Sequence, residues 1–174
     1  MKYKLSAPFD EKLIRSLRAG DRVELSGTVY TGRDAAHKRL VALLDAGEKL
    51  PVDLAGQAIY FVGPCPAPPG RPIGSAGPTT SGRMDAYSPR LIAECALRAM
   101  IGKGARSEAV KAAMKEHGCV YFAATGGAGA LIANSIVDAQ VVAFEDLGPE
   151  AIYKLELRDL PLVVAIDAEG NSLY

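Results

Sequence analysis

Four residues with side chains suited to anion binding stand where glycine and proline interrupt regular structure. Arg33 follows a predicted strand, Arg83 lies in a glycine-rich loop, and Lys103 stands between two glycines. Thr79, in the same loop as Arg83, adds a hydroxyl. Cations that converge in a cleft need an anion, because burying an unpaired charge costs several kcal/mol. Arginine forks suit carboxylates and phosphates, so these residues predict a site for a small polyanion.

The loop that carries two of these residues is residues 70–85, GRPIGSAGPTTSGRMD. Its glycines let the backbone approach a ligand closely, and its prolines reduce the entropy that is lost when the ligand orders the loop. Thr80, beside Thr79, offers a second hydroxyl. The composition excludes regular helix or strand and predicts a binding loop.

A simpler interpretation of the cations remains open. Each could be a solvated surface charge or part of a local salt bridge, Arg33 with Asp34 or Arg83 with Asp85, since such pairs are common and contribute little. His37 lies one helical turn after Arg33 and therefore on the same helix face. It could hydrogen-bond a substrate, hold Arg33 in place, or be a histidine satisfied by a neighbour.

Length and composition indicate a single domain over residues 1–174. The chain has 49% hydrophobic residues, enough for one well-buried core. Its 20 basic and 20 acidic residues cancel, which argues against nucleic acid or a membrane surface as a partner. The N-terminus lacks the apolar core of a secretion signal, and no apolar run approaches the roughly 20 residues of a membrane span. We expect a cytoplasmic protein.

The three cysteines do not predict a metal site or a disulfide framework. Cys65, Cys95 and Cys119 are odd in number, far apart, and match no zinc motif. Cys95 and Cys119 lie in apolar surroundings and are expected to be small core residues. Cys65, which prolines flank, is the one whose reactivity we would test.

Alternating periodicities predict the elements that position these residues. The expected elements are helices over 9–18, 34–46, 91–102, 107–117 and 129–136, strands over 23–30, 59–62 and 119–123, and further buried runs over 141–144 and 162–166. Ser107 is the expected N-cap of one helix and Gly118 its end. Strands and helices that alternate in this way predict an α/β fold with a mixed sheet.

Several motifs, taken in order, resemble one enzyme family. They are TGRDAAH at 31–37, PVDL at 51–54, YFVGP at 60–64, GPTTSGRMD at 77–85, IGKG at 101–104, AATGG at 123–127 and the closing stretch 150–167. Together they resemble the β component of class I, iron-sulfur-dependent fumarate hydratases and L-tartrate dehydratases. The resemblance covers nearly the whole chain, and the loop motif is long and specific.

The resemblance implies a swivelling β/β/α domain with a mixed, largely parallel sheet. It also implies an α subunit as partner, whose three cysteines hold a [4Fe-4S] cluster with one iron open to substrate. The cysteines of this chain do not fall in that cluster motif, so no metal ligand is assigned here. The enzyme is then expected to be a hetero-oligomer of αβ units that share the active site, inactive without the α subunit.

By the same resemblance, Arg33, Arg83 and Lys103 grip the carboxylates of a small dicarboxylate, with Thr80 as a further substrate-binding residue. Thr79 is the base that removes a proton from carbon. His37 and Asp85 are expected to support these side chains. The cluster iron takes the departing hydroxyl as a Lewis acid, while the cations stabilise charge on the carboxylate.

The implied reaction is the interconversion of fumarate and (S)-malate. L(+)-tartrate dehydration is the alternative, because tartrate differs from malate by one hydroxyl. A more remote alternative is a non-catalytic module that binds dicarboxylates.

Overall fold

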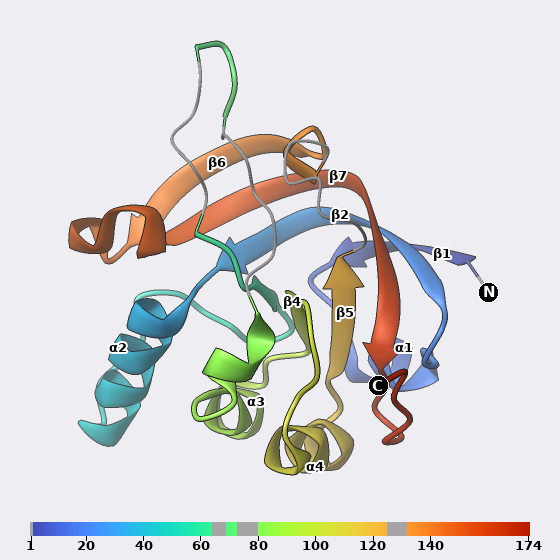
Figure 1. The fold of residues 1–174 in the computed structure, drawn as a ribbon. Helices are drawn as coiled ribbons and strands as arrows, with labels where there is room; N and C mark the ends of the chain where they lie inside the picture. The colour runs from blue at the N-terminus through green and yellow to red at the C-terminus, as the bar shows by residue number, and fades with distance from the viewer. Residues whose placement is uncertain (1, 64–68, 73–79, 125–131) are drawn as a thin grey trace.

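A computed structural model describes residues 2–63, 69–72, 80–124 and 132–174, which form a curved sheet with helices on its outer side (Figure 1). The strands are β1 (Lys2–Ala7), β2 (Arg22–Thr31), β3 (Ala58–Tyr60), β4 (Ala99–Gly102), β5 (Val120–Ala124), β6 (Ile136–Ala143) and β7 (Ile152–Ile166). The helices are α1 (Glu11–Ser16), α2 (Asp34–Asp45), α3 (Ser88–Cys95) and α4 (Glu108–His117), with 3₁₀ turns η1 (Ser81–Met84) and η2 (Glu145–Glu150).

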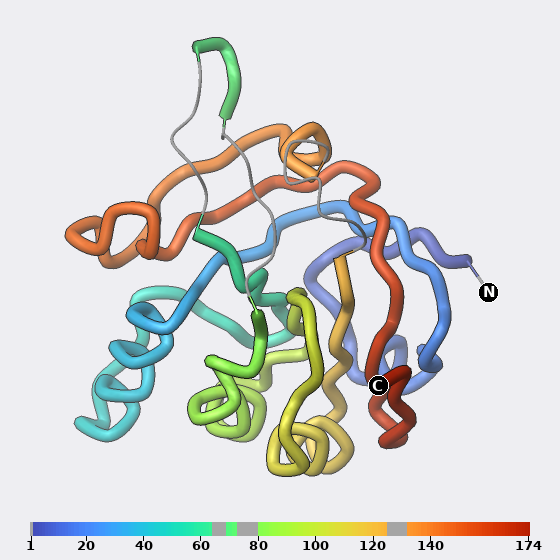
Figure 2. Tube along the Cα trace, viewed as in Figure 1, coloured from blue at the N-terminus to red at the C-terminus, as the bar shows by residue number. Residues whose placement is uncertain are grey.

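The sheet closes on itself. Its strand order is β1-β2-β3-β4-β5-β7-β6, and a further antiparallel pairing joins β2 to β7. Strands β2, β3, β4 and β5 run parallel to one another, while β7 runs antiparallel to β2, β5 and β6. Figure 2 shows the long β7 bending from its pairing with β6 to its pairing with β5. The expected α/β fold with a mixed, largely parallel sheet is confirmed.

Side-chain alternation along the strands produces two cores. On β3, Ala58 and Tyr60 point into the barrel, whereas Ile59 points outward beneath the helices. The outer core holds Leu40 of α2 and Leu91 of α3, both almost fully buried. Strands apolar on both faces are typical of parallel sheets covered by helices.

Local signals fix the ends of α4 as expected. The Ser107 hydroxyl accepts a hydrogen bond from the backbone amide of Val110 at 3.3 Å, which caps the helix start. Gly118 ends the helix with φ of +79°, a left-handed conformation that glycine adopts at little cost. The prediction of a helix over 107–117 is confirmed to within a residue.

The predicted helix over 91–102 is wrong in its second half. Helix α3 ends at Cys95, and its C-cap, Ala96, takes a left-handed conformation with φ of +56°. The chain then enters β4, where Met100 and Ile101 are fully buried on opposite faces of the sheet. An apolar run buried on both faces has no clear period, so its pattern cannot separate helix from strand.

Two further expectations in the C-terminal half need correction. Of the predicted helix over 129–136, residues 129–131 lie outside the described residues, Ile132 and Ala133 are helical, and Ile136 already belongs to strand β6. The run 141–144 is not uniformly buried, because Val141 and Val142 are each 37% exposed on β6. This strand pairs only with β7 among the described strands, which leaves its outer edge open.

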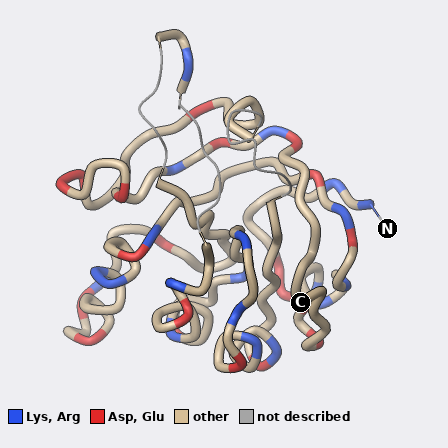
Figure 3. The backbone as a smooth tube through the Cα atoms, viewed as in Figure 1, with Lys and Arg blue, Asp and Glu red and all other residues tan. Residues whose placement is uncertain are grey.

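Charge is spread evenly over the fold. Figure 3 shows basic and acidic residues interspersed along the described backbone, without a face of one sign. Among the described helices, none has the length and apolarity needed to cross a membrane.

Candidate functional site

Arg33 and Lys103, two of the expected site residues, lie at the same edge of the sheet. Arg33 lies just past the carboxyl end of β2, Gly63 past that of β3, and Lys103 past that of β4. Because these strands are parallel neighbours, their carboxyl ends open at the same edge. In α/β sheets this edge is where ligands bind.

A hollow of about 280 Å³ at this edge contains two of the predicted cations. We call it the arginine hollow; its lining residues are Arg33, Asp34, Ala35, Lys38, Arg83, Tyr87 and Glu150. Lys38 and Tyr87 are not among the predicted site residues. Tyr87 follows Arg83 by four residues, whereas Lys38 and Glu150 are far from Arg83 in the sequence, and the packing of α2 beside η1 and η2 brings them to it.

The Arg33 side chain packs tightly on glycine backbone. A Cβ atom built on Gly63 would lie 2.9 Å from both the Cδ and the Nη1 of Arg33, so a side chain there would displace the guanidinium from its place. The Nε of Arg33 is buried and has no hydrogen-bond partner among the described residues. A buried N–H donor left unpaired is costly, which makes it a donor available to a ligand.

The local salt bridges considered as the simpler interpretation do not form. No described ion pair involves Arg33, Arg83 or Lys103. Asp85 pairs with Arg106 instead of Arg83. Two unpaired guanidinium groups on one hollow can bind an anion bearing two carboxylates.

His37 supports the backbone of Arg33 and does not reach into the hollow's lining. It is fully buried, and its Nδ1 lies 2.8 Å from the carbonyl oxygen of Arg33, to which the protonated nitrogen donates. Its ring contacts those of Phe61 and Tyr87, with centroids 5.4 and 6.1 Å away. Burial lowers the pKa of His37 to about 4, so the ring is neutral near pH 7.

Lys103 lies beside the glycine-rich loop but does not line the arginine hollow. Thr80 and Lys103 form a parallel β-bridge, and the Ser81 amide donates to the Lys103 carbonyl at 2.9 Å. The side chains of both Thr80 and Lys103 are exposed. Thr79, the predicted base, lies outside the described residues, as does Cys65.

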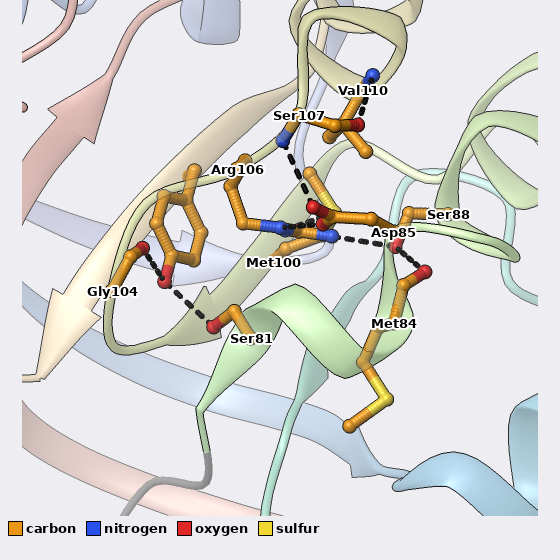
Figure 4. Close-up of polar contacts among 10 residues, drawn as sticks. Ser81, Met84, Asp85, Ser88, Met100, Gly104, Arg106, Ser107 and Val110 are labelled. Atoms are coloured by element: carbon orange, nitrogen blue, oxygen red, sulfur yellow. Dashed lines mark hydrogen bonds and ion pairs between the residues drawn. The ribbon is translucent and has the colours of Figure 1, made fainter.

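Asp85 and Arg106 form a buried ion pair beneath the loop (Figure 4). The Nε of Arg106 donates to the Asp85 carboxylate at 2.7 Å, and the other carboxylate oxygen accepts from the Ser107 amide at 2.9 Å. Asp85 thus ties the end of the loop to Ser107 at the start of α4. The sequence analysis missed Arg106, because its polar neighbours give no sign that it is buried.

The described part of the chain does not fit the ligand set of an iron-sulfur cluster. It contains no group of three or more His, Cys, Asp or Glu side chains that could hold a metal ion. Cys119 is fully buried, and burial raises the pKa of its thiol to about 12, far from the thiolate that iron requires. Cys95, by contrast, is only partly buried and packs against the edge of the outer core.

The sequence profile of the family described as "Fumarase C-terminus" matches residues 1–174. The chain is 40% identical over 177 residues to "Fumarate hydratase class I, anaerobic" of Escherichia coli (strain K12), a match that covers 100% of this chain and 32% of that protein. It is 37% identical over 177 residues to "Fumarate hydratase 2" of Leishmania major, covering 100% and 31%.

A third relative has nearly the same length as this chain. It is a Methanocaldococcus jannaschii protein provisionally named L(+)-tartrate dehydratase subunit beta, 40% identical over 169 residues that cover 94% of this chain and 87% of that protein. The chain therefore spans about a third of the fumarate hydratases it matches and most of this subunit.

Proposed function

This chain belongs to the Fumarase C-terminus family, and we propose that it is the β subunit of a two-subunit hydro-lyase for a four-carbon dicarboxylate, with fumarate and (S)-malate as the preferred pair. The observation that carries the proposal is the arginine hollow. It presents Arg33 and Arg83 together, without an ion pair to any described residue, at the carboxyl edge of the sheet. Asp34 and Glu150 also line the hollow but form no described ion pair with either arginine, so a small diacid is proposed to supply the carboxylates that these guanidinium groups bind.

Arg33 and Arg83 hold the substrate carboxylates in this proposal. Removing a proton from the carbon beside a carboxylate places enediolate-like charge on its oxygens, and fixed guanidinium donors stabilise that charge as it develops. The buried Nε of Arg33 is one such donor. The glycine at position 63 keeps its guanidinium in place, and the neutral His37 anchors its backbone.

Thr79 is the proposed base. Its neighbour Thr80 is bridged to Lys103, so the backbone of the loop and the lysine are held together just beyond residue 79. An alcohol is a poor base unless nearby cations favour its alkoxide, which Lys103 and Arg83 would do. Thr80 is proposed to contact substrate through its exposed hydroxyl.

A partner subunit is proposed to bring the [4Fe-4S] cluster. The length match to a protein named as a beta subunit supports a separate partner chain, while the fumarate hydratases that match are about three times longer. The described residues of this chain offer no ligand set for the cluster, so its ligands are assigned to that partner. Several αβ units would then assemble into the hetero-oligomer.

L(+)-tartrate dehydratase is the second candidate, favoured by the relative that has nearly the full length of this chain. Co-expression with a candidate α subunit under anaerobic conditions, followed by assays with fumarate, (S)-malate and L(+)-tartrate, separates the two. We expect turnover of fumarate and malate. Activity with tartrate alone assigns the second function, and diacid binding without turnover of any of the three assigns the non-catalytic module.

The base is tested by Thr79→Ala in the same assembly. We expect kcat to fall by about 100-fold or more, the range that general-base catalysis supplies, with little change in binding of a diacid inhibitor. Thr28→Ala is the matched control, because the Thr28 hydroxyl is bonded to Glu156 of β7 at 2.9 Å and Thr28 does not line the arginine hollow, so the substitution should leave kcat unchanged. Turnover that survives Thr79→Ala rules out Thr79 as the base.

A further inference from the structure

Arg106 is a buried charge that the proposed chemistry does not use. Its side chain is completely inaccessible to solvent, and its guanidinium lies between the rings of Phe61 and Tyr121, 5.1 Å from each centroid. An apolar side chain of similar volume would fill this space without the desolvation cost of a charge. What the guanidinium adds is a set of N–H donors in fixed directions.

Those donors join three separate parts of the chain (Figure 4). Nε donates to Asp85 at 2.7 Å, Nη2 to the hydroxyl of Ser88 at 2.8 Å, and Nη1 to the sulfur of Met100 at 3.2 Å. Asp85 follows η1, Ser88 begins α3, and Met100 lies in β4. One side chain therefore fixes η1 and α3 against the strand that leads to Lys103.

Two of the partners of Arg106, Asp85 and Ser88, are in turn bonded to backbone. Asp85 accepts the amide of Ser107 through its second oxygen, and the Ser88 hydroxyl donates to the carbonyl of Met84 at 3.1 Å. Met84, the last residue of η1, and Ser107, the residue before α4, are thereby linked to the same guanidinium.

A second set of contacts closes the arrangement on the other side. The hydroxyl of Tyr121, whose ring stacks on Arg106, donates to the carbonyl of Gly104 at 2.9 Å and accepts from the hydroxyl of Ser81 at 2.6 Å. Ser81 is itself bonded to Lys103 through its amide. Segment 80–88 and segment 102–107 thus meet around Arg106 along their whole length.

We propose that Arg106 is a positioning residue, which sets the placement of Arg83 and Lys103 relative to each other without touching substrate. The inference rests on the proposed function, since those two cations are the ones that bind the diacid. Both cations are exposed and lack a described ion pair, so their own side chains do not fix their placement. The buried guanidinium beneath them does.

The test compares Arg106→Lys with Arg98→Lys in the assembled αβ protein. Lysine keeps the charge but cannot reach three partners in fork geometry. Arg98 is also a largely buried arginine bonded to backbone, since it donates to the carbonyls of His117 and Gly118, but it lies at the opposite end of β4. We expect Arg106→Lys to lower kcat/KM by about 100-fold, the effect of a misplacement near 1 Å, and Arg98→Lys to change it less than twofold.

Amide hydrogen exchange provides a readout that does not depend on turnover. In Arg106→Lys, exchange should quicken at the amides of Ser81 and Ser107, which bond across the two segments, while the amide of Val110 in α4 keeps its rate. Where Arg106→Lys does not fold, Asp85→Asn replaces it, because it keeps the shape of the side chain and removes the charge pairing.

Faster exchange confined to these two amides, together with the loss in kcat/KM, supports the proposal. Unchanged kinetic constants in Arg106→Lys overturn it. Amide exchange that quickens uniformly over the chain, and not at Ser81 and Ser107 in particular, also overturns it. A wild-type assembly inactive on all three diacids refutes the proposed function alone; the exchange pattern then decides whether Arg106 locks the two segments.

Discussion

We expect the substitution Gly102→Ala, at the end of β4, to disrupt the candidate site. Gly102 is buried, and a Cβ atom built there would lie 1.9 Å from the Oγ of Ser81 and 2.8 Å from the Cδ2 of Phe61. Ordinary contact begins at 3.4 Å, so in Gly102→Ala the Ser81 hydroxyl must move by about 1.5 Å. That shift breaks its hydrogen bond to Tyr121 and displaces the start of η1, on which Arg83 lies.

The expected effects are on both stability and turnover. Overpacking a buried position costs about 1–3 kcal/mol of unfolding free energy. For a chain of this size, each kcal/mol lowers the thermal midpoint by roughly 2–4 °C. Displacing Arg83 and Lys103 by about 1 Å should also lower kcat/KM of the assembled protein by about 100-fold.

Thermal unfolding and steady-state kinetics of the assembled protein measure these effects. Gly82→Ala is the matched stability control, because a Cβ at Gly82 meets no atom within 4 Å and its φ is not positive. We expect no loss in its thermal midpoint. In the double variant Gly102→Ala/Ser81→Ala the closest clash is gone, and part of the lost stability should return. The reasoning is refuted if Gly102→Ala unfolds at the same temperature as Gly82→Ala.

Two further predictions concern pH and a buried turn. Because burial holds the pKa of His37 at about 4 in the fold against about 6.5 when unfolded, the unfolded chain takes up the proton first. The free energy of unfolding should fall by about 3 kcal/mol as pH drops from 6.5 to 4, and this loss should be absent from His37→Asn. Urea unfolding of the wild type and of this variant at pH 7 and 4.5 measures the loss. Parallel losses in the two proteins contradict the prediction. Asp167 is buried, which opposes ionisation, but amides of Ala19, Asn171 and Glu169 donate to its carboxylate and lower its pKa overall. The ionised Asp167 carboxylate therefore stabilises the fold at neutral pH, and this stabilisation is lost as pH falls through the folded pKa. Asp167→Asn should lower the free energy of unfolding by about 1.5–3 kcal/mol in urea unfolding at pH 7. A change near zero would show that these hydrogen bonds do not stabilise the fold.

Sequence patterns predict the elements that glycine and cap residues delimit. Helix α4 is read correctly, because Ser107 and Gly118 mark its two ends. The end of α3 is missed because Ala96 adopts the left-handed conformation without being glycine. Strand β1 is missed because only Leu5 in it is buried, so its alternation is weak.

The site residues, too, are predicted where glycine marks them and missed where only tertiary contacts define them. Gly32 beside Arg33 marks that arginine as a residue at the end of a strand, whereas Lys103 is expected after a helix and follows strand β4 instead. The parallel order of β2, β3 and β4 explains why both residues share the carboxyl edge. The role of Arg106 cannot be predicted from the sequence, because it depends on contacts with Asp85 and Ser88 of segment 80–88 and with Met100 of β4, which the fold brings together around it. Tertiary contacts of this kind leave no local pattern.

A crystal structure of the assembled αβ protein with a bound non-reactive diacid, such as succinate, tests the central claim most directly. The account predicts that the guanidinium groups of Arg33 and Arg83 each contact a carboxylate of the ligand in the arginine hollow, with the amine of Lys103 turned toward it. A diacid bound elsewhere, with both arginines still in solvent, would contradict it.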